Sequence, residues 1–216
     1  MKEHHIRIGK MARYFTLGHA GDSVEQVWFV CHGYGQSASS FLKNFDAFND
    51  STHLIVAPEA LSRFYWQGFS GDVGASWMTR EDRLNEIQDY VSYLDDVHDR
   101  IFTQVDRASV KIVVLGFSQG TSTVCRWITH GKVTCEQLIL WAGVIPPDLD
   151  LKQKEDIFGK LKLTFVVGSK DEIASPKAVA HEKQRLERDG FPYQWLSFDG
   201  GHRLDSEILK KISNRL

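Results

Sequence analysis

The sequence has few of the residues that mark exported, membrane-spanning or disulfide-bonded proteins. Only three of its 216 residues are cysteine, at Cys31, Cys125 and Cys135, and none of them forms a C-x-x-C pair. An odd, dispersed set within or beside apolar segments indicates buried reduced thiols. No segment approaches the roughly 18 apolar residues of a membrane span, and the first residues lack the apolar core of a signal peptide. We therefore expect a cytoplasmic protein.

The charges of the chain are nearly balanced, with 26 Lys and Arg against 28 Asp and Glu. Because no basic patch stands out, neither nucleic acid nor an anionic membrane surface is an expected partner. There is no H-E-x-x-H motif, and His4-His5 is a weak ligand pair, so we expect no metal and no other cofactor. A hydrophobic content of 42% fits one globular domain over residues 1–216, as a monomer or homodimer.

Short apolar segments alternate with helical patterns along the chain. The segments typical of buried parallel strands are 26–31, 53–57, 111–115, 137–141, 163–167 and 193–198. The helical patterns cover residues 84–105, 116–130, 175–189 and 205–216. Residues 5–8 and 12–17 alternate in polarity and predict an N-terminal antiparallel hairpin. This order predicts an α/β fold with a mostly parallel central sheet, that hairpin, and helices on both faces.

The strand 26–31 runs into a glycine turn, Gly33-Tyr34-Gly35, for which two roles are open. As Gly33-x-Gly35-x-x-Ala38 it matches a dinucleotide-binding loop, and Glu59 follows where a ribose-binding acid is expected. Alternatively, the backbone N–H groups of the turn bind the oxyanion that forms when an ester is cleaved. The two roles require different residues elsewhere in the chain.

A G-x-S-x-G motif spans Gly116 to Gly120, with Ser118 at its centre, between a predicted strand and a helical pattern. A nucleophile elbow belongs at such a junction, because a sharp turn there exposes the serine hydroxyl. The alternative is an idle N-cap serine in a glycine-rich turn. As a nucleophile, Ser118 needs a base and an acid that orients the base.

Both partners follow later strands. Asp171 lies in a turn just after strand 163–167, and His202 follows the last strand beside two glycines. Glu172 and Asp199 are rival acids, but Glu172 points away if Asp171 points in, and Asp199 fits better as an organiser of its own turn. We predict Ser118 as nucleophile, His202 as base and Asp171 as acid.

These residues favour the oxyanion role for the glycine turn. A dinucleotide-binding protein leaves Ser118, Asp171 and His202 without a function, whereas a hydrolase uses all three. The oxyanion is then expected to bind to the N–H groups of Tyr34 and Gln119. A dinucleotide-binding oxidoreductase and a catalytically silent binding protein of the same fold are the alternative functions.

The motifs resemble the phospholipase/carboxylesterase family of α/β-hydrolases, which includes the acyl-protein thioesterases. The resemblance covers nearly the whole chain and rests on HGYGQSA, GFSQG, KDEIASP and GGH. It implies an α/β-hydrolase fold and a serine esterase with the triad and oxyanion donors named above. The chain departs from the family at Gln36, where an acid is usual, and at Thr121, where a second glycine is usual. Ser76-Trp77-Met78 stands in place of the usual Trp-Phe-Asp.

The segment 59–80 carries several aromatic residues without a clear helical or strand period. It leaves the end of a strand on the side where Ser118 must emerge, and long irregular segments there often build sites. We expect Trp66, Trp77 and Met78 to contact the acyl or alcohol part of the substrate. With little chain for a lid, the open cleft should favour small to medium acyl esters or thioesters.

Overall fold

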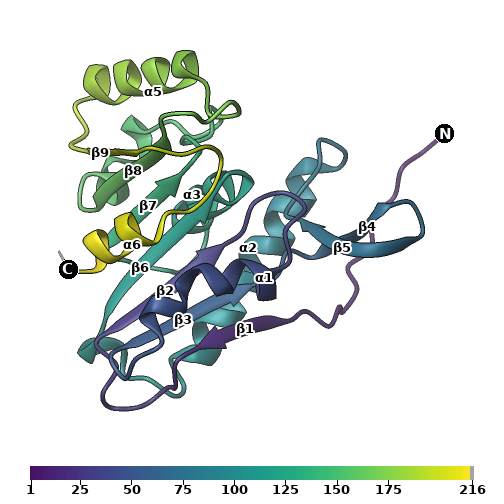
Figure 1. Cartoon of the computed structure of the whole chain (residues 1–216). Coiled ribbons are helices and arrows are strands. Elements are labelled where there is room, and N and C mark those ends of the chain that lie inside the picture. Colours follow the sequence, from purple (N-terminus) through teal and green to yellow (C-terminus); the bar gives the residue numbers. More distant parts are fainter. Residues whose placement is uncertain (215–216) are drawn as a thin grey trace.

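A computed structural model describes residues 1–214 as two sheets with surrounding helices (Figure 1). The strands are β1 (Tyr14–Leu17), β2 (Gln26–Cys31), β3 (His53–Pro58), β4 (Ser62–Gln67), β5 (Ser70–Ser76), β6 (Lys111–Phe117), β7 (Gln137–Trp141), β8 (Lys162–Gly168) and β9 (Gln194–Phe198). The α-helices are α1 (Ala38–Leu42), α2 (Arg83–Ile101), α3 (Gln119–His130), α4 (Glu155–Phe158), α5 (Pro176–Asp189) and α6 (Ser206–Ser213). Short 3-10 helices are η1 (Lys43–Phe48), η2 (Arg107–Ser109) and η3 (Lys152–Lys154).

The central sheet has the strand order β1-β3-β2-β6-β7-β8-β9 in the described part of the chain. All neighbouring strands in it pair in parallel except β1, which runs antiparallel to β3. Parallel neighbours need a crossover, and the helices between the strands supply it. The predicted α/β fold with a mostly parallel sheet is confirmed.

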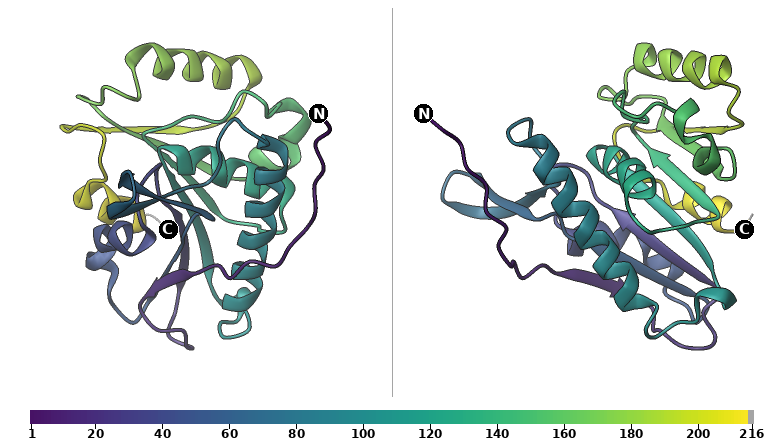
Figure 2. Two further views of the ribbon diagram at one scale, coloured as in Figure 1. Left: turned by 90° about the vertical axis from the view of Figure 1, so that its right-hand side faces the viewer. Right: turned by 180° about the vertical axis from the view of Figure 1, so that it is seen from behind.

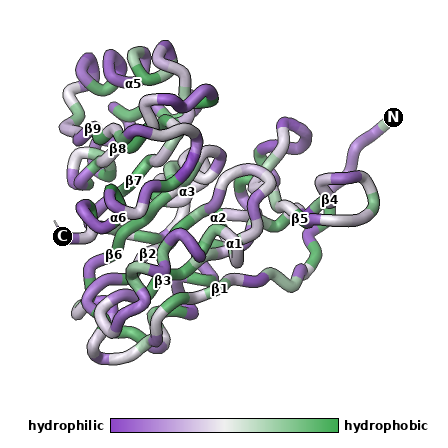
Figure 3. The backbone as a smooth tube through the Cα atoms, in the orientation of Figure 1, coloured by the Kyte–Doolittle hydropathy of each residue, from purple (hydrophilic) through white to green (hydrophobic). Residues whose placement is uncertain are grey.

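Helices cover both faces of this sheet, as predicted (Figure 2). In β2, Phe29 and Cys31 pack in one core with residues of α2, α3, α4 and α5, whereas Trp28 and Val30 pack in the other with α1 and α6. Successive side chains of a strand point to opposite faces, so a single strand supplies both cores. The central strands are accordingly the greenest part of the backbone in Figure 3.

The antiparallel parts differ from the prediction in two places. Residues 5–8 form no strand, and β1 pairs with β3 instead of with a preceding strand. The side chains of Ile6 and Ile8, the apolar side of the alternating segment, are 87% and 76% exposed, so no burial of apolar surface stabilises a strand there. Conversely, the segment expected to be irregular forms the hairpin β4–β5, which projects from the body in Figure 1. The pairing register shifts between Tyr65 and Gln67. This shift interrupts the alternation of side chains along β4, so the sequence shows no clear strand pattern there.

The predicted helices lie close to their expected places. Helix α3 begins at Gln119 because β6 continues to Phe117. Helix α5 begins after Ser175, whose hydroxyl accepts the N–H of Ala178 as an N-cap. Helix α6 ends at Ser213, and the predicted helical residues 215 and 216 lie outside the described residues. No helix within residues 1–214 is both long and apolar enough to cross a membrane.

Candidate active site

Four predicted site residues follow the carboxyl ends of parallel strands. Tyr34 comes after β2, Ser118 after β6, Asp171 after β8 and His202 after β9. Ligand sites of open α/β sheets lie outside these strand ends. The fold therefore directs the four residues to one edge of the sheet.

Ser118 has the backbone conformation of a sharp turn, with φ 52° and ψ −116°. A non-glycine residue rarely adopts a positive φ, and such strain at a strand-to-helix junction is typical of a nucleophile elbow. Two neighbouring glycines make the turn possible. A Cβ on Gly116 would lie 2.3 Å from the carbonyl oxygen of Gly120, and one on Gly120 would lie 2.2 Å from that of Cys31. Any larger residue at either position would push these chains apart.

Asp171 and His202 form a buried pair. The carboxylate of Asp171 is fully buried, and its Oδ2 lies 2.9 Å from Nδ1 of His202. Because a carboxylate only accepts, Nδ1 carries the proton and donates it, which leaves Nε2 as the acceptor. The N–H groups of Ile173 and Ala174 donate to Oδ1 of Asp171 at 2.9 and 2.8 Å. The ring of His202 packs against that of Phe117, next to Ser118, with centroids 4.9 Å apart.

The rival acids lie elsewhere. Asp199 is 78% exposed and pairs with Lys170 at 2.7 Å. Glu172 is exposed, and its side chain has no hydrogen bond to the described residues. Among the three acids considered from the sequence, Asp171 is the one that contacts His202 in residues 1–214.

The glycine turn leaves one of its N–H groups available. Gly33 donates to the side-chain Oε1 of Gln36 at 2.8 Å, and Gly35 donates to the carbonyl of Ala75 at 2.8 Å. The N–H of Gln36 donates to the carbonyl of Gly33 at 3.2 Å. The N–H of Tyr34 has no acceptor within residues 1–214. It is thus the N–H of this turn that is left to bind a ligand.

Gln119 offers a second N–H group, because the first residues of a helix have no intrahelical acceptor. Its side chain is engaged with the segment after β5. Oε1 accepts the N–H of Trp77 at 3.1 Å, and Nε2 donates to the carbonyl of Met78 at 2.9 Å. These bonds hold the backbone of Gln119 in place at the start of α3.

Trp77 lies in the core and not on the cleft. Its side chain is 2% exposed, packs edge-on against Tyr90, and donates its indole N–H to the carbonyl of His32 at 2.9 Å. Met78 is half-buried, with its sulfur 3.4 Å from Nη1 of Arg126. These positions do not favour the predicted substrate contacts of Trp77 and Met78. Trp77 instead supports the chain just before the glycine turn.

Trp66 remains at the surface of the site. Its side chain is 53% exposed on β4, and its indole N–H donates to the carbonyl of Gly35 at 2.9 Å. The ring also meets that of Tyr34 edge-on, with centroids 6.0 Å apart. The hairpin therefore places Trp66 at the rim of the glycine turn.

A cavity of about 250 Å³ opens beside Ser118. Its wall is mainly apolar and includes Val144, Val166, Ile173, Ala178 and Trp195. A larger groove of about 960 Å³ runs along α5 and has Val144 and Ala178 in common with this cavity, but Ser118 does not line it. The smaller cavity is the candidate acyl site, because the candidate nucleophile forms part of its wall.

His32 supports the turn, and the sequence analysis assigned it no role. It is fully buried; Nε2 accepts the N–H of Ala60 at 3.1 Å, and Nδ1 donates to the carbonyl of Gly33 at 2.8 Å. Burial lowers the pKa of His32, which fits the neutral ring that this bonding requires. Its position directly before the glycines was the only signal in the sequence.

Glu59, the expected ribose-binding acid of the dinucleotide alternative, is used within the protein. It is 3% exposed, pairs with Nε of Arg13 at 2.6 Å, and accepts the N–H of Ala38 at 3.3 Å. A carboxylate held by two protein donors away from solvent is not placed to receive a ribose. The main support for the dinucleotide alternative is thereby removed.

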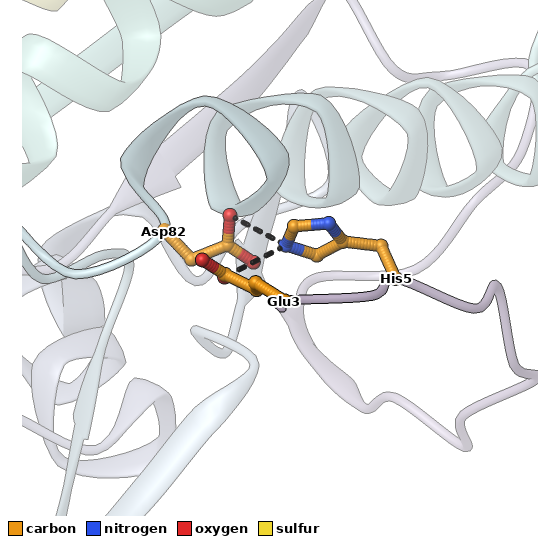
Figure 4. A group of neighbouring side chains, drawn as sticks. All are labelled: Glu3, His5 and Asp82. Atoms are coloured by element: carbon orange, nitrogen blue, oxygen red, sulfur yellow. Dashed lines mark ion pairs between the residues drawn. The ribbon is translucent and has the colours of Figure 1, made fainter. Parts of the chain in front are cut away.

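Within residues 1–214, one group of three side chains of a type that can bind a metal lies close together. These side chains are Glu3, His5 and Asp82 (Figure 4). Nε2 of His5 lies 3.2 Å from a carboxylate oxygen of Glu3 and 3.3 Å from one of Asp82. All three residues are exposed, and they come from the N-terminal segment and the start of α2. A surface contact between one imidazole and two carboxylates accounts for the arrangement.

The fold and the elbow define an α/β-hydrolase. The sequence profile of the phospholipase/carboxylesterase family matches residues 13–216, and the chain belongs to this family. It is a serine hydrolase that acts on esters or thioesters. A comparison with curated protein sequences found no match.

Solved structures show the same fold. Acyl-protein thioesterase 2 of Zea mays is 16% identical with a TM-score of 0.72, over 95% of this chain and 97% of that one. A carboxylesterase from Mesorhizobium loti is 18% identical with a TM-score of 0.70, over 94% of each chain. A Bacillus cereus carboxylesterase is 16% identical with a TM-score of 0.66, over 95% of this chain and 93% of that one.

Proposed function

We propose that the protein hydrolyses carboxylic esters or thioesters through an acyl-enzyme on Ser118. The observation that carries the proposal is the buried hydrogen bond from Nδ1 of His202 to Asp171, beside the elbow. This bond fixes the tautomer in which Nε2 can accept a proton. A serine hydroxyl needs such a base to become a nucleophile.

In the first half of the reaction, Oγ of Ser118 attacks the carbonyl carbon of the substrate, and its proton passes to Nε2 of His202. The carbonyl π electrons move to the oxygen, which the N–H groups of Tyr34 and Gln119 stabilise as an oxyanion. When the C=O bond re-forms, the bond to the leaving group breaks. The leaving alcohol or thiol takes the proton from His202, and Ser118 is left acylated.

Water completes the cycle. His202 accepts a proton from the water as its oxygen attacks the acyl carbon, and the same two N–H groups stabilise the second oxyanion. Collapse releases the carboxylic acid and returns the proton to Oγ of Ser118. Throughout, Asp171 stays ionised and stabilises the imidazolium of His202.

The cavity beside Ser118 supports a preference for small to medium acyl groups. Its volume of about 250 Å³ lies below the range of pockets that hold drug-sized ligands, which begins at about 300 Å³. Its mainly apolar wall suits a hydrocarbon chain, and none of its lining residues carries a charge that would pair with a charged acyl group. The exposed ring of Trp66, at the rim of the glycine turn, is the candidate contact for the leaving group.

Covalent labelling tests the proposal. The protein is incubated with a fluorophosphonate, its intact mass is measured, and the modified peptide is mapped. One phosphonyl adduct on Ser118 is expected, together with hydrolysis of p-nitrophenyl acetate, butyrate and hexanoate. An unmodified protein, or an adduct on another residue, would show that Ser118 is not the nucleophile.

A further inference from the structure

The carbonyl oxygen of Ser118 accepts two hydrogen bonds from a single residue, Thr121. The backbone N–H of Thr121 donates to it at 3.0 Å, and the side-chain hydroxyl donates to it at 2.7 Å. The same hydroxyl lies 3.5 Å from the carbonyl of Val144, which is too far to compete for its one proton. Thr121 is buried, so its hydroxyl is shielded from water and committed to the elbow.

Gly143 leaves the space that this hydroxyl occupies. A Cβ placed on Gly143 would lie 2.3 Å from Oγ1 of Thr121, 2.7 Å from its Cγ2 and 3.0 Å from the carbonyl oxygen of Ser118. The side chain of Thr121 is branched at Cβ and therefore has few rotamers in a helix. Packing against Gly143 and the hydrogen bond to Ser118 thus hold the hydroxyl in the same place.

The peptide unit that contains this carbonyl also contains the N–H of Gln119. It is trans, because residues 1–214 have no cis peptide bond. In a planar trans peptide the C=O and the N–H point in opposite directions. The ψ angle of Ser118, −116° in the strained elbow, determines how this unit is turned. Two donors on the carbonyl oxygen therefore also fix the direction of the Gln119 N–H.

We infer that Thr121 is a positioning residue for the oxyanion site: its hydroxyl holds the Ser118–Gln119 peptide so that the N–H of Gln119 faces the oxyanion. This inference rests on the proposed reaction at Ser118 and adds to it a residue that acts through Gln119. A donor that is fixed before the reaction needs no rearrangement when negative charge develops, and such donors contribute most to stabilising the transition state.

The inference predicts where the effect of a substitution will appear. The negative charge on the carbonyl oxygen is present in the transition state and absent in the bound ester. A misdirected N–H therefore lowers kcat and leaves KM nearly unchanged. We expect a loss of about tenfold, smaller than the roughly 10²- to 10³-fold for a deleted donor, because the N–H of Gln119 itself remains.

Three substitutions at Thr121 separate its hydroxyl from its methyl group. Thr121→Val keeps the branched shape without the hydroxyl, and Thr121→Ser keeps the hydroxyl without the methyl group. Thr121→Ala differs from Thr121→Ser by the hydroxyl alone, so this pair decides the question even if Thr121→Val does not fold.

Thr123→Val is the matched control on the same helix. Thr121 and Thr123 are both 1% exposed. The hydroxyl of Thr123 also bonds a backbone carbonyl, that of Gln119 at 3.3 Å. This carbonyl belongs to the next peptide unit, which does not contain the N–H of Gln119. The control therefore loses an equally buried hydroxyl without releasing the proposed oxyanion donor.

For each variant, kcat and KM are measured on p-nitrophenyl acetate, and thermal unfolding is followed to compare folding. Thr121 also lines the cavity beside Ser118, and a two-carbon acyl group is the least sensitive to the size of that cavity. The inhibition constant of a trifluoromethyl ketone supplies a second readout. In its adduct, Oγ of Ser118 is bonded to the ketone carbon, the serine proton rests on His202, and the ketone oxygen carries the negative charge.

If Thr121 positions the donor, Thr121→Val and Thr121→Ala lose about tenfold in kcat with KM changed by less than about threefold. Their inhibition constants for the ketone rise by about the same factor as kcat falls, whereas Thr121→Ser and Thr123→Val stay within about twofold of the wild type. An equal loss in Thr121→Ser would assign the effect to the methyl group, and an equal loss in Thr123→Val would assign it to the helix in general. Either result overturns the inference, as does wild-type kcat in Thr121→Ala or an effect on KM alone.

Fluorophosphonate labelling of the wild type keeps this result separate from the proposed reaction. If the wild type is not labelled at Ser118, the proposed function fails, and the inference that rests on it fails with it. If the wild type is labelled and active and the hydroxyl-free variants match it, the proposed function stands and only the role of Thr121 is rejected.

Discussion

The indole N–H of Trp141 donates a hydrogen bond of 2.9 Å to the carbonyl oxygen of Arg203. The carbonyl of the same Trp141 accepts the N–H of Ser118 at 2.8 Å. Trp141 is fully buried at the end of β7. One buried residue therefore connects the elbow to the loop that carries His202.

Ser118→Ala should lower kcat by about 10⁴- to 10⁶-fold, because the hydroxyl that forms the acyl-enzyme is absent. The chain offers a matched control in Ser213. Its Oγ lies 2.8 Å from Nε2 of His53, whose Nδ1 lies 2.9 Å from Asp50, so the same three residue types meet again away from the elbow. Ser213→Ala should keep wild-type ester hydrolysis. Comparable losses in the two variants would contradict the assignment of Ser118.

Asp171→Asn should lower kcat by about 10⁴-fold with the fold retained. The amide places an NH₂ or a weaker acceptor against Nδ1 of His202, so the ring loses the tautomer that leaves Nε2 free. Asp199→Asn is the control, since Asp199 is 78% exposed. Steady-state kinetics on p-nitrophenyl acetate checks both, and a large loss for Asp199→Asn would reassign the acid.

Ala178→Phe should fill the cavity beside Ser118 and shift the preference towards short acyl chains. We expect kcat/KM for p-nitrophenyl hexanoate to fall by about tenfold, in line with one to three kcal/mol for pocket contacts, while the value for acetate changes little. Ala180→Phe, also on α5, is the matched control, because Ala180 is exposed and does not line the cavity. An unchanged chain-length profile in Ala178→Phe would place the acyl group elsewhere.

The three thiols should be inert in the folded protein. Burial raises the pKa of Cys31 and Cys125 well above the ordinary range and that of Cys135 to about 12. Only the thiolate reacts, so iodoacetamide at about pH 8 should leave the native mass and the ester hydrolysis unchanged. In denaturant all three thiols should be alkylated. Rapid inactivation of the native enzyme would point to a thiol in the site.

Asp148→Asn should lower the free energy of unfolding at neutral pH by about 1–2 kcal/mol, because it breaks the ion pair of Asp148 with Arg126. The loss is smaller than for a fully buried ion pair, because the Asp148 side chain is 34% exposed. The guanidinium of Arg126 holds the pKa of Asp148 at about 2, below its ordinary value of 3.8. A lowered pKa in the folded state stabilises the fold above about pH 4, and this contribution disappears as the pH falls towards 2.

Urea unfolding measured from about pH 7 down to pH 2 checks this linkage. The difference between wild type and Asp148→Asn should be largest near neutral pH and should shrink in acid. Asp156→Asn is the control, because Asp156 is exposed on α4 and forms no ion pair within the described residues. A difference that stays constant down to the lowest pH would mean that Asp148 acts through packing and not through its charge.

The sheet was predictable because its strands are buried on both faces. In segments such as 137–141, where four apolar residues follow Gln137, no polar residue alternates with the apolar ones, and β7 has these same bounds. The pairing of Asp171 with His202 was predictable for a related reason, since parallel strands bring their carboxyl ends to one edge. Neither inference needed the path of the loops between the strands.

The hairpin β4–β5 and the position of Trp77 could not be predicted in the same way. A bulge between Tyr65 and Gln67 interrupts the period of two that identifies a strand. An aromatic residue near a site looks the same in the sequence whether it faces the substrate or the core. Trp77 lies in the core because its backbone binds Gln119 and its indole binds His32, two contacts of long range along the chain.

Two backbone hydrogen bonds join the glycine turn to the end of the hairpin. The N–H of Gly35 donates to the carbonyl of Ala75, and the N–H of Ala75 donates to the carbonyl of Gln36. The far end of the same hairpin is exposed, and the side chain of Phe69 there is 98% exposed. We therefore expect the two ends to tolerate substitution and insertion unequally. The tip is free to drift, lengthen or acquire new surface, while a one-residue slip at Ala75 would displace the loop next to the nucleophile.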